Sequence, residues 1–148
     1  MDAAGLALKS NLLRVFAFKT ISQIGYAYRK SSISRSFSRQ RLSFHAGQRL
    51  PFVAHENIYP LFREARFHLL HIGDNRLDDG LARSIEPLFS FAVGLVDIRL
   101  SDAWRSLGVK NELFVLVRPD NYIAAIFDKF DEVLITEYAR RYLAMIRR

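Results

Sequence analysis

The stretch that decides the fold runs from Leu113 to Ala125 and reads Leu-Phe-Val-Leu-Val-Arg-Pro-Asp-Asn-Tyr-Ile-Ala-Ala. Its first part is a continuous apolar run of strand length, which is typical of a strand buried on both faces. Pro119 then presets a turn, and Asn121 tolerates the left-handed conformation that a tight connection often needs. The apolar residues Tyr122 to Phe127 follow at once. This pattern predicts an antiparallel hairpin.

Upstream of the hairpin, strand patterns alternate with helix patterns. Phe67 to Ile72 is a continuous apolar run that ends at Gly73-Asp74-Asn75, and it predicts a buried strand. The other predicted elements are a helical turn over Ile58 to Ala65, a helix over Asp79 to Leu88, a strand over Ser90 to Ile98 that is weakened or bulged near Gly94, and helical turns over Asp102 to Leu107 closed by Gly108. Asp131 to Arg148 has apolar residues at helical spacing, which predicts an amphipathic helix capped by Asp131 or a nearby carboxylate.

The predicted elements from Phe67 onward follow the order strand, helix, strand, helix, strand, strand, helix. Alternating strands and helices followed by a hairpin indicate an α/β fold with a mixed four-stranded sheet and helices on both faces. This is the minimal element order of the thioredoxin-like fold.

The N-terminal part has a different pattern. Ala3 to about Lys30 has apolar residues at broadly helical spacing, whereas Ser31 to Ser43 is rich in Ser and Arg and has few helix or strand signals. We therefore predict a helix followed by a basic linker or extended arm over residues 1–45. The thioredoxin-like domain is expected over residues 46–148.

The composition narrows the possible functions. The 148 residues suit one domain, and half of them are apolar, so the chain should fold. There is no Cys, which excludes disulfides, thiol nucleophiles and dithiol redox chemistry and suits a cytoplasmic location. Residues 1–50 hold nine basic side chains and one acid, whereas residues 51–148 hold 13 basic and 14 acidic ones. The positive charge therefore belongs to the N-terminal third.

Several polar residues have only a structural interpretation. His68 and His71 lie three apart on a predicted strand, so they point to opposite faces and cannot share a metal. Asp97 and Asp102 flank the end of a predicted strand, but no nucleophile accompanies them. Trp104 is expected in the core. The helix that follows the first strand is expected to be capped by nearby carboxylates, namely Asp74, Asp78 and Asp79.

Three segments carry a resemblance to a known family. Ser22 to Ser34 contains Tyr-Arg-Lys-Ser, residues 46–51 read Ala-Gly-Gln-Arg-Leu-Pro, and residues 117–124 read Val-Arg-Pro-Asp-Asn-Tyr-Ile-Ala. With the strand from Phe67 to Gly73, their order and spacing resemble the C-terminal domain of the class A FAD-dependent aromatic-ring hydroxylases, of the phenol hydroxylase and pentachlorophenol monooxygenase type. Asn121 stands where that family has glycine, and Ala125-Ile126 stands where it often has Trp-Arg.

The resemblance implies a thioredoxin-like fold, and it implies FAD, NAD(P)H and an aromatic substrate for a full-length member of the family. This chain lacks the Gly-x-Gly-x-x-Gly fingerprint that lets a backbone approach a dinucleotide. The loop Gly73 to Leu77, which matches the redox loop of thioredoxin-like enzymes, has no Cys, and Val109 to Glu112 has no proline before the third strand. We therefore assign no catalytic, cofactor-binding or metal-binding residue and expect no activity from this chain alone.

The expected function is that of a redox-inactive C-terminal module of an FAD-dependent aromatic monooxygenase. It would dock on the catalytic FAD and substrate domains or on a second copy, and residues 1–45 would be the remnant of the junction with that catalytic body. The alternative is a free-standing basic protein that uses residues 9–49 to contact nucleic acid or an anionic surface.

One feature separates these functions. RNA-binding sheets place exposed aromatic residues beside basic ones on their strands, whereas the basic residues here lie outside the predicted strands. We therefore expect no nucleic-acid partner. No apolar run is long enough to predict a membrane span.

Overall fold

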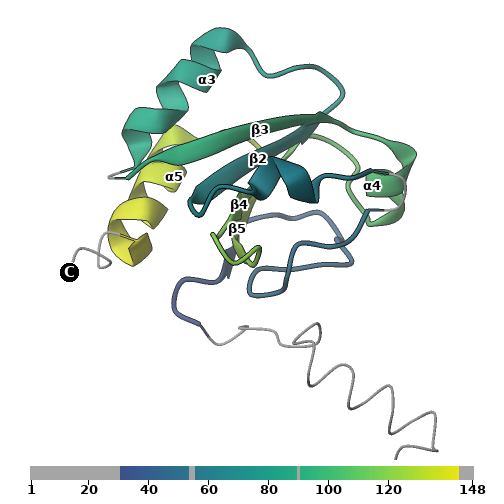
Figure 1. Ribbon diagram of the computed structural model, residues 1–148, viewed down its shortest axis with the longest axis horizontal. Coiled ribbons are helices and arrows are strands. Elements are labelled where there is room, and N and C mark those ends of the chain that lie inside the picture. Colours follow the sequence, from purple (N-terminus) through teal and green to yellow (C-terminus); the bar gives the residue numbers. More distant parts are fainter. Residues whose placement is uncertain (1–30, 54–55, 90, 144–148) are drawn as a thin grey trace, which may run out of the picture.

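The computed structural model describes residues 31–53, 56–89 and 91–143, so the helix predicted over Ala3 to Lys30 lies outside the described residues. The fold is α/β, with one mixed sheet of five strands in the order β1-β5-β4-β2-β3 (Figure 1). The strands are β1 (Arg35–Ser36), β2 (Phe67–Gly73), β3 (Val93–Arg99), β4 (Leu113–Val117) and β5 (Ile123–Phe127). The α-helices are α3 (Asp79–Ile85), α4 (Asp102–Ser106) and α5 (Glu132–Tyr138).

The predicted hairpin is present. β4 and β5 pair antiparallel, with Phe114 opposite Phe127. Asn121 has a φ of 64°, the left-handed conformation expected at that turn. The turn is closed by the Arg118 N–H, which donates to the Tyr122 carbonyl at 2.8 Å, and by the Asn121 N–H, which donates to the Arg118 carbonyl at 2.9 Å.

The prediction of four strands is wrong, because β1 adds a fifth strand at the edge of the sheet, parallel to β5. The Phe37 N–H donates to the Ile126 carbonyl at 2.8 Å, and the Phe37 ring stacks on Phe127 with centroids 5.2 Å apart. A strand of two residues is too short to show alternation in the sequence. Part of the segment expected as a linker or extended arm thus belongs to the sheet.

Of the weakening or bulge expected near Gly94, the bulge is absent. β2 and β3 pair parallel in unbroken register from Phe67 opposite Val93 to Gly73 opposite Arg99. A Cβ on Gly94 would lie 2.5 Å from Cδ2 of His68. The glycine therefore makes room for a neighbouring ring instead of interrupting the strand.

Helices cover both faces of the sheet, as predicted, and Figure 1 shows α3 and α5 on the side away from α4. On one face, Trp104 of α4 is fully buried and packs in a cluster with Leu70 and Val115. On the other face, Ile85 of α3 and Ile135 of α5 pack in a second cluster. Each fully buried Leu or Ile contributes about 1.5–3 kcal/mol to folding.

The helix ends agree with the sequence. Asp131 caps α5, since its carboxylate accepts the Leu134 N–H at 3.0 Å. Short turns extend two predicted helices: a 3-10 turn, Glu86–Leu88, follows α3, and a π-helical turn, Ala139–Leu143, follows α5. A 3-10 turn over Tyr59–Phe62 lies within the helical turn predicted ahead of β2. Gly108, at a φ of 93°, follows α4, as expected.

Candidate functional site

The first candidate site lies at the carboxyl ends of β2 and β3. In open α/β sheets, ligands commonly bind beyond the carboxyl ends of parallel strands. Residues Gly73 to Leu77 leave β2 at this edge and lead toward α3. The family resemblance compares this loop with the redox loop of thioredoxin-like enzymes, and the loop has no Cys.

His71 is the buried ionisable group beneath this loop. Its side chain is 2% exposed, with Nδ1 2.7 Å from Oδ1 of Asp97 and Nε2 3.1 Å from Oε1 of Glu112. Its imidazole is also packed against the backbone, because a Cβ on Gly73 would lie 2.8 Å from the ring. Ionised carboxylates only accept hydrogen bonds, so both contacts are satisfied when each ring nitrogen carries a hydrogen.

The surrounding carboxylates hold the loop in place. Asp97 Oδ2 accepts the Leu77 N–H at 3.1 Å, and Asp74 pairs with Arg105 at 2.8 Å. Asp78 Oδ1 accepts the Gly80 N–H at 2.8 Å and thereby caps the start of α3, whereas Asp74, also expected to cap this helix, pairs with Arg105 instead. The loop is thus fastened at both ends by side-chain hydrogen bonds.

A polar groove of about 470 Å³ opens above this loop and is lined by Asp74, Asn75, Arg76, Asp97, Ile98 and Arg99. Asp74 and Asp97 are already engaged by Arg105 and His71, respectively. The two remaining charged groups are the guanidinium groups of Arg76 and Arg99. None of the lining side chains is a hydroxyl, thiol or amine nucleophile, so the groove suits electrostatic contact more than covalent catalysis.

The two histidines lie on opposite faces of β2, as the sequence predicts. His68 meets the Phe62 ring edge-on, with centroids 5.2 Å apart, and packs beside Gly94. Burial and the nearby Arg66 lower the pKa of His68 below its ordinary value. Among the described residues, no group of three or more His, Cys, Asp or Glu side chains is placed to hold a metal ion.

From the sequence, Asp97 and Asp102 were expected to flank the end of a strand, and the structure joins Asp97 to His71. Glu112, the third member of this cluster, was not identified as a site residue. It lies 41 residues from His71 in the chain, and only the pairing of β2 with β4 brings the two together. No local motif carries that information.

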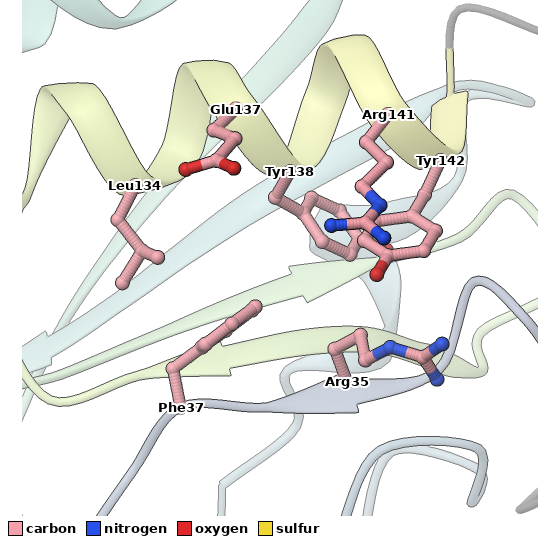
Figure 2. Close-up of a pocket in the computed structure, with 7 residues that line it drawn as sticks. All are labelled: Arg35, Phe37, Leu134, Glu137, Tyr138, Arg141 and Tyr142. Atoms are coloured by element: carbon pink, nitrogen blue, oxygen red, sulfur yellow. The ribbon is translucent and has the colours of Figure 1, made fainter.

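A second hollow, of about 290 Å³, lies between β1 and α5 (Figure 2). The residues that line it are Arg35, Phe37, Leu134, Glu137, Tyr138, Arg141 and Tyr142. The guanidinium carbons of Arg35 and Arg141 lie 4.8 Å and 5.5 Å from the Tyr142 ring centroid. A hydrogen bond from Arg35 lowers the pKa of Tyr142, whereas burial raises the pKa of Tyr138 well above its ordinary value.

Comparison of the chain with protein-family models, with curated proteins and with solved structures gives no match. Within residues 31–53, 56–89 and 91–143, no helix has the length and apolar character needed to cross a membrane. The fold and the geometry of the two hollows therefore carry the functional argument.

Proposed function

We propose that this chain is a redox-inactive thioredoxin-like module that serves an FAD-dependent aromatic monooxygenase by docking rather than by chemistry. Support comes from the four longer strands, whose order is β5-β4-β2-β3, with β2 parallel to β3 and antiparallel to β4. This is the strand arrangement of the thioredoxin-like fold. The motifs at residues 46–51 and 117–124, which resemble the aromatic-ring hydroxylases, favour that family.

The main support for the proposal is that the loop Gly73 to Leu77 has no Cys and is held by side-chain hydrogen bonds. A thioredoxin-like redox enzyme needs thiols at this loop, where a helix N-terminus lowers their pKa. Here the loop has no sulfur, and Asp97 and Asp74 fasten it to His71 and Arg105. A fastened loop without a nucleophile suits a domain whose task is to present a stable surface.

The proposed partners follow from the family resemblance. They are the catalytic FAD and substrate domains of a larger enzyme or a second copy of this chain, in the cytoplasm. FAD and NAD(P)H would bind the catalytic body, since this chain has no Gly-x-Gly-x-x-Gly segment. The isolated chain should therefore give no saturable FAD binding in a fluorescence titration.

Module exchange tests the docking role. In one variant of a phenol hydroxylase-type enzyme, this chain replaces the C-terminal module. In two controls, the module is either replaced by a thioredoxin, which tests the fold alone, or deleted. We expect this chain to preserve the assembly mass and FAD content better than either control, as measured by light scattering and flavin absorbance. Equal losses with this chain and with the thioredoxin would overturn the proposal.

One observation favours the alternative, in which residues 9–49 contact nucleic acid or an anionic surface. Arg35 lies on β1 and stacks on Tyr142, so a basic residue does sit on a strand beside an aromatic ring. Arg39, Arg41 and Arg49 are exposed. Fluorescence anisotropy with single-stranded RNA tests this function: salt-dependent binding that Arg39→Gln and Arg41→Gln weaken would favour it over docking.

A further inference from the structure

The hollow between β1 and α5 combines apolar walls with a charged end. Figure 2 shows Leu134 and Phe37 facing one another across the gap, with Tyr138 beside them. At the other end, Arg35 and Arg141 gather around Tyr142. The hollow thus has two chemically distinct halves, as expected of a site for a small amphipathic ligand.

The charged end is electropositive. Both guanidinium groups lie over the Tyr142 ring, and in the part of the chain that the structure describes neither forms an ion pair with a carboxylate. Arg35 donates to the Ser34 carbonyl at 3.0 Å and to Tyr142, and its guanidinium group has further N–H donors. Glu137 is the acidic residue in the lining. Two positive charges against one negative charge attract an anion and repel a cation.

The apolar walls are fixed before any ligand arrives. The Phe37 ring lies flat on Phe127 and meets Tyr138 edge-on, with centroids 6.1 Å apart. The Tyr138 hydroxyl donates to the Ile33 carbonyl at 2.6 Å and holds that ring in place. A preformed wall spares a ligand the entropic cost of ordering side chains.

Size and chemistry together define the ligand. A volume of about 290 Å³ corresponds to roughly ten water molecules, which is room for one ring and a carboxylate. A carboxylate suits the donors of Arg35 and Arg141. An aromatic ring suits the rings of Phe37 and Tyr138, which favour offset or edge-on neighbours. A bare inorganic anion would leave the apolar walls unused.

We propose that the hollow between β1 and α5 is a binding site for a small aromatic carboxylate, with its carboxylate at Arg35 and Arg141 and its ring against Phe37 and Leu134. This site is separate from the Gly73 to Leu77 loop. The proposal does not rest on the docking function proposed above.

Titration of the full chain with benzoate, followed by NMR chemical shifts, tests the site. A ligand of this size should bind with a dissociation constant of about 1 mM. Benzyl alcohol keeps the ring without the charge, acetate keeps the charge without the ring, and benzylamine reverses the charge. We expect each to bind more weakly than benzoate, with the benzoate shifts centred on Phe37, Leu134 and Tyr142.

Variants locate the carboxylate. Arg141→Gln should weaken benzoate binding about tenfold, the worth of one charge-assisted hydrogen bond. Arg140→Gln is the matched control, because Arg140 is the exposed residue before Arg141 in the same π-helical turn and does not line the hollow. Arg35→Gln should act like Arg141→Gln. Equal binding of benzoate and benzyl alcohol, equal effects of Arg141→Gln and Arg140→Gln, or no saturable shift at all would each overturn the proposal.

Discussion

His71 and Asp97 are directly opposite partners in the parallel pairing of β2 and β3, and their side chains meet at 2.7 Å. The pair therefore joins two adjacent strands by side chains as well as by backbone. Asp97 extends the link to the Leu77 N–H, while Glu112 approaches the imidazole from the loop before β4. One buried ring thus connects two strands and two loops at the carboxyl edge of the parallel strands.

This arrangement predicts unequal effects for the two carboxylates. Asp97→Asn removes the charge from the contact with a buried ring and should lower the free energy of unfolding by about 1–3 kcal/mol. The Glu112 side chain is 47% exposed, so Glu112→Gln should cost less than about 1 kcal/mol. Urea unfolding of both variants and the parent measures the difference. If the two variants had the same urea midpoint, the Asp97 contact would contribute no more to the free energy of unfolding than the Glu112 contact.

The sequence predicted most of the sheet because its signals are local. The apolar run of β2 and the turn Arg118-Pro119-Asp120-Asn121 each fix an element within a few residues. β1 was not predicted, because a strand of two residues shows no periodicity in the sequence. The position of the neighbouring Phe37 depends on its stacking against Phe127, which is distant in the sequence.

The candidate sites were harder to predict because they join distant segments. His71 was noticed for its position on a strand, but its partner Glu112 follows only from the pairing of β2 with β4. Arg35 was counted as part of a basic segment, and its contact with Tyr142 needs the docking of β1 beside α5. Spacing along the chain gives no sign of either contact.

Gly94 should be intolerant of any side chain. A Cβ there would lie 2.5 Å from the buried ring of His68, which has little room to move. Gly94→Ala should therefore lower the free energy of unfolding by about 1–3 kcal/mol through overpacking. Urea unfolding at neutral pH measures this change.

Gly80→Ala is the matched control. A Cβ on Gly80 would lie 2.9 Å from Oδ1 of Asp78, the tip of an exposed side chain that can turn aside. The gain in helix propensity, about 0.5–1 kcal/mol, should offset most of the weakened cap. A smaller loss for Gly94→Ala than for Gly80→Ala would contradict the close packing of His68.

Asn121 should respond to substitution according to its backbone conformation. At a φ of 64°, Asn121→Gly should be neutral or slightly stabilising, because glycine adopts this region without strain. Asn121→Val should cost about 1–3 kcal/mol, because a β-branched residue is strained there. Urea unfolding of the three proteins distinguishes these outcomes. If Asn121→Val and the parent had the same urea midpoint, Asn121 would not have the left-handed conformation in the turn of the hairpin.

Tyr138 should make the fold sensitive to alkaline pH. Burial raises the pKa of Tyr138 above its ordinary value of 10.0, so the folded state holds this proton where the unfolded chain has lost it. The unfolded state then binds fewer protons, and the free energy of unfolding falls as the pH rises above about 10, by about 1.4 kcal/mol per pH unit. The contribution is fully present below that pH. Urea unfolding at a series of alkaline pH values measures the slope.

Tyr138→Phe separates this ionisation from the rest of the titration. The variant loses the hydrogen bond to the Ile33 carbonyl and should be less stable by about 1 kcal/mol at neutral pH. Above pH 10 it should lose stability less steeply than the parent, because the buried group no longer ionises on unfolding. Other tyrosines and lysines titrate in both proteins, so their contributions cancel in the comparison. Parallel pH profiles for the two proteins would mean that Tyr138 is not protected from solvent by Phe37 and Phe127.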